Sequence, residues 1–88
     1  MQDRKTLRRH AELLDAMAQR LSVDLEDAVF RGDLRPDEIA DAVLRCADCP
    51  NPRHCAEWLL NHPRGAETTP QFCRNRAELE RLRGGAGR

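Results

Sequence analysis

The apolar residues of this 88-residue chain recur at helical spacing from its first turns onward. Apolar side chains at three- and four-residue intervals predict a first helix over about residues 3–21. This stripe consists of Leu7, Ala11, Leu14, Met17 (or Ala18) and Leu21. His10 lies at the edge of the stripe, where we expect a partly exposed helix histidine in preference to a metal ligand.

A shorter apolar pattern predicts a second helix over about residues 24–31, with Asp24 at its N-cap. Gly32 is placed to end this helix in a left-handed conformation. Phe30 is the largest apolar group here, and we expect it to contact the first helix in the core. The other inward positions are Leu25, Ala28 and Val29.

A third helix is predicted from Pro36 to about Cys46, because proline suits the first helical turn and the acidic residues 37–38 favour its positive end. Ile39, Val43 and Cys46 fall on one stripe, which directs the Cys46 thiol inward from the last turn.

A fourth helix is predicted over 52–61, where Asn51 can cap the first turn and Trp58 shares a face with Cys55. Residues 69–73 suggest a short helical turn. Asn75 can cap a final helix that carries Leu79 and Leu82.

The pattern contains no strand-like alternation and no internal repeat. It therefore predicts an all-α fold, a small bundle of four to five short helices in one domain over 1–83. The first and third helices should form its base. Residues 84–88 (GGAGR) are expected to be a disordered tail.

The charge composition does not alter the predicted fold. The 15 basic and 15 acidic residues balance to a formal net charge of zero. That balance argues against a general nucleic-acid binder, which usually carries excess Lys and Arg. No stretch has the length of a membrane span or the apolar run of a signal peptide, so the expected location is the cytoplasm. Thiols stay reduced there.

All four cysteines lie in one segment with the spacing C-x2-C-x5-C-x17-C, and this pattern carries the candidate chemistry. They are Cys46, Cys49, Cys55 and Cys73. Four thiolates satisfy either a tetrahedral zinc ion or a [4Fe–4S] cluster, and we expect all four to bind one centre. Both centres are anionic. The basic residues close to them in sequence are Arg45, Arg53, His54, Arg64, Arg74 and Arg76.

The spacing favours a [4Fe–4S] cluster. Structural zinc sites usually have two short cysteine pairs, and this chain has one. A proline directly after a ligand, as in Cys49-Pro50, also occurs in bacterial ferredoxin motifs. Zinc is the alternative, and structural thiols or disulfides are a third possibility.

The run CADCPNPRHCAEWLL resembles the C-x2-C-P-x4-C segment of WhiB-like transcription factors, which carry a [4Fe–4S] cluster, and is similar to part of the endonuclease III cluster loop. In both families the fourth cysteine lies upstream, whereas here it is Cys73. Neither DNA repair nor transcription is implied. Over nearly its full length the chain resembles a family of short bacterial proteins of uncharacterised function. That likeness rests on HAELLDAMAQRLSVDLEDAV, DAVLRCADC, CAEWL and FCRNRAEL.

Three function classes follow. The first is a non-catalytic iron–sulfur protein that responds to redox state or oxygen, or passes electrons, through an unidentified protein partner. The second is a zinc-stapled interaction module. An enzyme is disfavoured because His54 and Cys55, as adjacent helical residues, point in different directions and make a poor catalytic pair.

Overall fold

The computed structural model describes residues 4–86, and that part of the chain contains five α-helices and no strand. The prediction of an all-α fold is therefore confirmed. The helices are α1 (Arg4–Arg20), α2 (Leu25–Phe30), α3 (Pro36–Asp48), α4 (Pro52–Asn61) and α5 (Arg76–Ala86).

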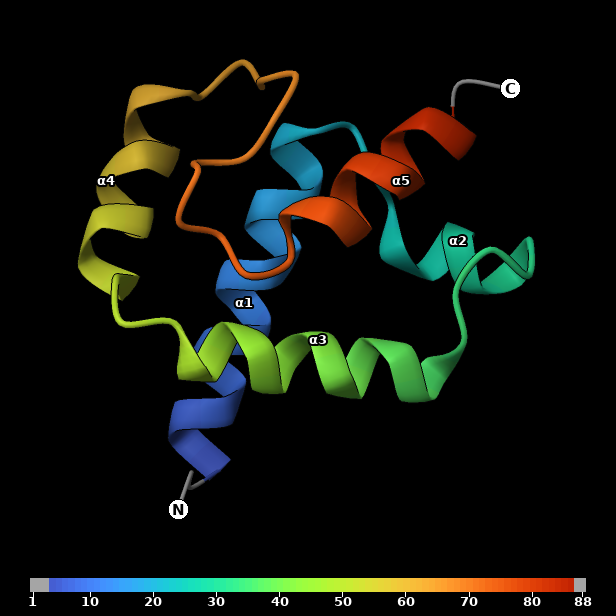
Figure 1. The fold of residues 1–88 in the computed structure, drawn as a ribbon, viewed down its shortest axis with the longest axis horizontal. Helices are drawn as coiled ribbons and strands as arrows, with labels where there is room; N and C mark the ends of the chain where they lie inside the picture. The colour runs from blue at the N-terminus through green and yellow to red at the C-terminus, as the bar shows by residue number, and fades with distance from the viewer. Residues whose placement is uncertain (1–3, 87–88) are drawn as a thin grey trace.

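Helix α1 is the centre of the bundle, since α3 and α4 both pack against it. In Figure 1, α3 crosses α1, α4 lies at the left and α2 at the right, and α5 lies between them above α3. The buried stripe of α1 supplies much of the core, as predicted. The core residues are Leu14, Met17, Ala18, Leu21, Val23, Ala28, Leu34, Ala42, Leu59, Leu79 and Leu82.

Helix α2 begins and ends as predicted, but one side chain that was expected in the core is exposed to solvent. The Asp24 carboxylate accepts a hydrogen bond from the Asp27 backbone N–H at 3.1 Å, and Gly32 follows the helix with φ +82°. Phe30, however, is 88% exposed, so the prediction that it contacts the core is wrong. Ala28 is fully buried, and a residue two positions later lies about 200° around the helix, on the solvent side.

Helix α5 runs to Ala86 and so includes residues 84–86, the first three positions of the predicted tail. Leu79 and Leu82 are almost completely buried and fix the helix against the core. Once such a helix is nucleated, each further residue adds a hydrogen bond, so the turn extends through two glycines. Residues 87–88 lie outside the described part of the chain.

The long connection from α4 to α5 is tied to the end of α1. The Ala66 N–H donates to the Arg20 carbonyl oxygen at 2.7 Å, and the Arg20 guanidinium donates to the Leu59 carbonyl at 3.2 Å. Beyond this anchor the connection returns across the bundle toward α3, as the orange segment of Figure 1 shows. This return brings the last cysteine back to the first three.

Candidate metal centre

Cys46 and Cys49 lie at the C-terminal end of α3. Cys46 is in the last turn, and Cys49 follows the helix as its C-cap, with its N–H donating to the Cys46 carbonyl at 3.1 Å. Both side chains are half-buried. The helix end thus presents two thiols from a single turn, as the C-x2-C spacing predicts.

Cys55 comes from the first turn of α4, which begins at Pro52 as predicted. Its N–H donates to the Asn51 carbonyl at 2.9 Å. The Asn51 side chain makes no capping hydrogen bond, which differs from the expected cap. Cys55 and Trp58 both pack against the core, as expected for residues that share a face of the helix.

Cys73 lies in a hydrogen-bonded turn, not in a helix, and its N–H donates to the Pro70 carbonyl at 3.1 Å. Burial raises the pKa of its thiol, although hydrogen bonds from the Asn75 backbone and the Thr69 side chain oppose that shift. The polar groups of its own loop thus partly offset the effect of burial on this thiol.

Asn75 clamps this loop onto α3. Its Nδ2 donates to the Ala42 carbonyl at 2.8 Å, and its Oδ1 accepts from the Arg45 Nε at 2.8 Å. Because Ala42 lies one helical turn before Cys46, the clamp holds the Cys73 loop beside the helix that carries the first cysteine pair. The predicted capping role of the Asn75 side chain is replaced by this long-range contact.

The four thiols are close enough to affect one another's ionisation. Burial raises the pKa of Cys46 to about 12, with further increases from repulsion by Cys55, Cys73 and Cys49. Burial likewise raises the pKa of Cys55 to about 11, and repulsion by Cys73 and Cys49 adds to it. The last cysteine, 18 positions beyond the third in the chain, is thus within electrostatic reach of the others.

None of the four cysteines forms a disulfide, so all four thiols are available as ligands. By donor type they fit a soft metal ion or an iron–sulfur cluster, and four thiolates in a half-buried site need a cation to offset their mutual repulsion. Among residues 4–86, no three His, Cys, Asp or Glu side chains are arranged to hold a metal ion as they stand. Ligation of one centre by all four stays a prediction.

His10 is the residue that sequence analysis misjudged. It is only 7% exposed, not partly exposed on the stripe edge, and its Nδ1 lies 3.6 Å from the Cys46 Sγ. The Cys46 thiol also lies 3.4 Å from the His10 carbonyl oxygen, which accepts its hydrogen bond. The signal was present in the sequence, since His10 is three residues after Leu7 and four before Leu14, which places it on the buried stripe.

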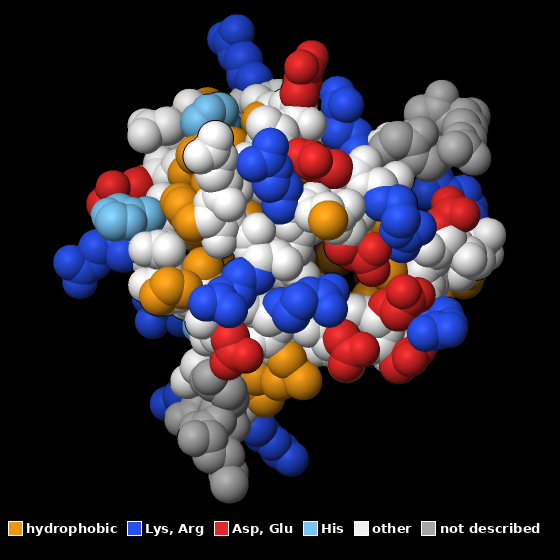
Figure 2. Space-filling view, viewed as in Figure 1, with side chains coloured by type: hydrophobic (Ala, Val, Ile, Leu, Met, Phe, Trp, Pro, Cys, Tyr) orange, Lys and Arg blue, Asp and Glu red, His pale blue; other side chains and the backbone are white. Residues whose placement is uncertain are grey.

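The basic residues near the cysteines divide into two groups. Arg45 is engaged by Asn75, and Arg76 pairs with Glu80 at 3.0 Å. The remaining arginines near the ligands are exposed. Figure 2 shows basic side chains across the middle of one face, with acidic side chains interspersed among them.

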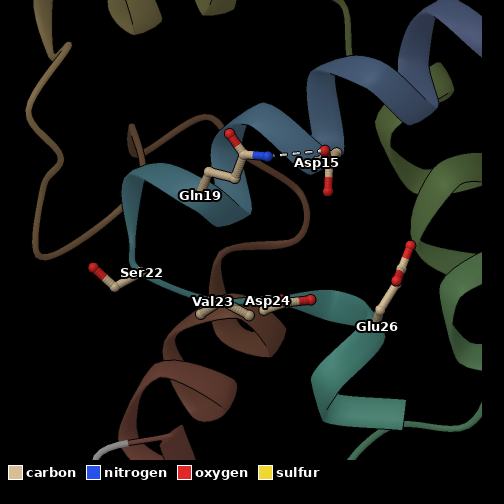
Figure 3. A pocket seen from close by; sticks show the side chains of 6 residues that line it. All are labelled: Asp15, Gln19, Ser22, Val23, Asp24 and Glu26. Atoms are coloured by element: carbon tan, nitrogen blue, oxygen red, sulfur yellow. Dashed lines mark hydrogen bonds between the residues drawn. The ribbon is translucent and has the colours of Figure 1, made fainter. Parts of the chain in front are cut away.

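A separate hollow of about 440 Å³ lies where α1 ends and α2 begins (Figure 3). Two of its three acidic groups have structural partners, since the Asp15 carboxylate accepts from the Gln19 side chain at 3.2 Å and Asp24 caps α2. It lies apart from the cysteines and carries no candidate chemistry.

Comparison with known proteins places the chain in a family. Residues 1–85 match the family of unknown function DUF6455, and the chain belongs to that family. No curated protein and no solved structure matches it. Within residues 4–86, no helix combines the length and apolar character needed to cross a membrane.

Proposed function

We propose that this protein is a small, non-catalytic [4Fe–4S] protein whose ligands are Cys46, Cys49, Cys55 and Cys73. The observation that supports this most directly is that four free, half-buried thiols come from the end of α3, the start of α4 and a loop clamped onto α3. When bound, such a cluster supplies one-electron redox chemistry. The role is redox or oxygen response, or electron transfer, through a protein partner.

The chain's own residues are suited to holding an anionic centre. The first turn of α4 carries no acidic residue, and its unpaired backbone N–H groups favour negative charge near Cys55. The Asn75 clamp holds the loop that carries the fourth ligand beside α3. Half-buried thiols leave one side of the centre accessible, which suits exchange of electrons with a partner.

The test is metal analysis and visible spectroscopy of protein purified without oxygen. We expect a brown protein with about four iron and four sulfide per chain. Each single Cys→Ser variant should lose most of the iron. Ala47→Ser, a half-buried position between the first two cysteines, is the matched control and should keep it. A colourless protein that holds one zinc per chain under the same handling would overturn the proposal.

A zinc-stapled interaction module is the second candidate, and one distance is compatible with it. Around a tetrahedral zinc ion, bond lengths of about 2.0 Å to nitrogen and 2.3 Å to sulfur put the two ligand atoms about 3.5 Å apart. His10 Nδ1 and Cys46 Sγ are 3.6 Å apart. In that case chelators should unfold the colourless protein, because metal binding supplies folding free energy.

A further inference from the structure

A second hollow, of about 390 Å³, lies between α1 and the start of α4. Its volume falls in the range of small-molecule pockets, about 300–1,000 Å³. Residues from both helices line it, including Thr6, Arg9 and His10 on α1 and Pro52, Arg53 and Ala56 on α4. The hollow is therefore formed by tertiary packing, and no single sequence segment encodes it.

The lining is basic and contains no carboxylate. Arg9 and Arg53 come from different helices, are exposed, and form no ion pair with any residue between 4 and 86. Two guanidinium groups beside a concave surface without a counter-charge attract an anion. Their planar, multi-donor geometry matches phosphate better than a spherical anion.

The start of α4 adds to this preference. Its first turn holds no acidic residue and its N-cap position, Asn51, provides no side-chain acceptor. The early backbone N–H groups of a helix have no partner within the helix and favour an anion. Here the first turn instead contains Arg53 and His54, which is the reverse of the usual charge distribution at this end of a helix.

His10 also lines the hollow and adds a polar group to its wall. It is only 7% exposed, its Nδ1 faces Cys46, and its other ring nitrogen, Nε2, has no hydrogen-bond partner within the described residues. This nitrogen is not among the fully buried atoms of the described residues, so a molecule bound in the hollow can reach it.

We propose that the hollow between α1 and α4 binds a small phosphorylated molecule, with the phosphate held by Arg9, Arg53 and the start of α4. Leu13, Pro52 and Ala56 form the apolar part of the wall and contact the organic portion. The site does not depend on the identity of the metal centre, and its test can succeed or fail independently of the iron–sulfur proposal.

The test is calorimetric and NMR titration of the full chain with inorganic phosphate and with glycerol phosphate. We expect saturable binding, with the largest amide shifts at residues 6–13 and 53–56. Arg9→Gln and Arg53→Gln should each weaken binding about tenfold, because each removes a charge-assisted hydrogen bond. Arg8→Gln and Arg64→Gln remove the same charge from exposed positions outside the hollow and should leave the affinity within about twofold.

Three outcomes would overturn the proposal. One is non-saturable binding. Another is equal weakening by Arg8→Gln and Arg9→Gln, which would show a general charge effect. The third is binding to vesicles that contain phosphatidic acid without binding to soluble phosphate, which would assign the surface to a membrane headgroup instead.

Discussion

The imidazole Nδ1 of His10 lies 3.6 Å from the Sγ of Cys46, although the two residues are 36 positions apart in the chain. The contact joins the buried face of α1 to the last turn of α3. It makes the central helix part of the wall around the thiols, so that the packing of the core and the position of the first ligand depend on each other.

His10→Ala should destabilise the protein by about 1–3 kcal/mol, because a buried polar contact is lost and the Cys46 thiol loses a neighbour. In the metal-free, reduced protein, Cys46 should also react several-fold faster with iodoacetamide as solvent enters the space left by the ring. Urea unfolding and mass spectrometry of the alkylated cysteines measure both effects. His54→Ala is the control, because His54 is exposed on α4. Equal effects of the two substitutions would contradict the assigned role of His10.

Asn75→Ala should cost about 2 kcal/mol or more, because both ends of this buried amide bond to α3. The loosened loop should lower retention of the metal as well, since Cys73 would no longer be held beside α3. Asn61→Ala changes an exposed asparagine at the end of α4 and should have little effect. Chemical unfolding and metal content of the two variants provide the comparison. A fully stable Asn75→Ala protein would show that the clamp does not hold the loop.

Gly65→Ala and Gly32→Ala should differ in cost. Both glycines have positive φ, +109° and +82°, which L side chains rarely adopt. A Cβ at Gly65 would also lie 2.9 Å from the Arg20 carbonyl oxygen, which already accepts the Ala66 N–H, whereas Gly32 has open space around it. We expect about 1 kcal/mol for Gly32→Ala and at least about 2 kcal/mol for Gly65→Ala. Thermal unfolding of both variants measures the two losses of stability. A larger loss for Gly32→Ala than for Gly65→Ala would be inconsistent with this geometry.

The metal-free protein should lose stability as the pH rises above about 9. Folding raises the pKa of Cys46 from 9.0 to about 12 and that of Cys55 to about 11, chiefly through burial. A raised pKa means that the folded state holds its proton more tightly. The stabilising contribution is therefore complete below the unfolded-state pKa and is lost as the pH rises toward the folded values.

Urea midpoints of reduced, metal-free protein at pH 7.5, 9.5 and 10.5 measure this loss. Few other side chains titrate in this pH range, because the chain has no Tyr and a single Lys. A Cys46→Ala/Cys55→Ala double variant should show a flatter dependence on pH. A slope unchanged by that substitution would assign the effect to other groups.

Much of the secondary structure could be predicted because its signals are local. Pro52 at the first helical position and His62-Pro63 after the last gave the bounds of α4 that the structure has. Gly32 has the left-handed conformation that its place after α2 predicted. These features depend on the neighbours of each residue within one helical turn.

Phe30 and Asn75 show where such reasoning fails. The size of Phe30 suggested burial, but its place on α2 opposite Ala28 sends it into solvent. Asn75 occupies the position before α5 where a capping side chain is expected, yet its amide crosses to Ala42 and Arg45 instead. Helix geometry around Ala28 decided the first outcome, and contact with a neighbouring helix decided the second.

The sequence by itself determined the helices, their main end signals and the grouping of the cysteines in one segment, because each depends on spacing along a backbone of fixed period. Only the tertiary structure decided that Cys73 returns to electrostatic reach of the other thiols and that His10 lies against Cys46. The physical reason is that a connection of 17 residues between Cys55 and Cys73 can take many paths. Its path here is selected by the Arg20 and Asn75 hydrogen bonds to distant parts of the chain.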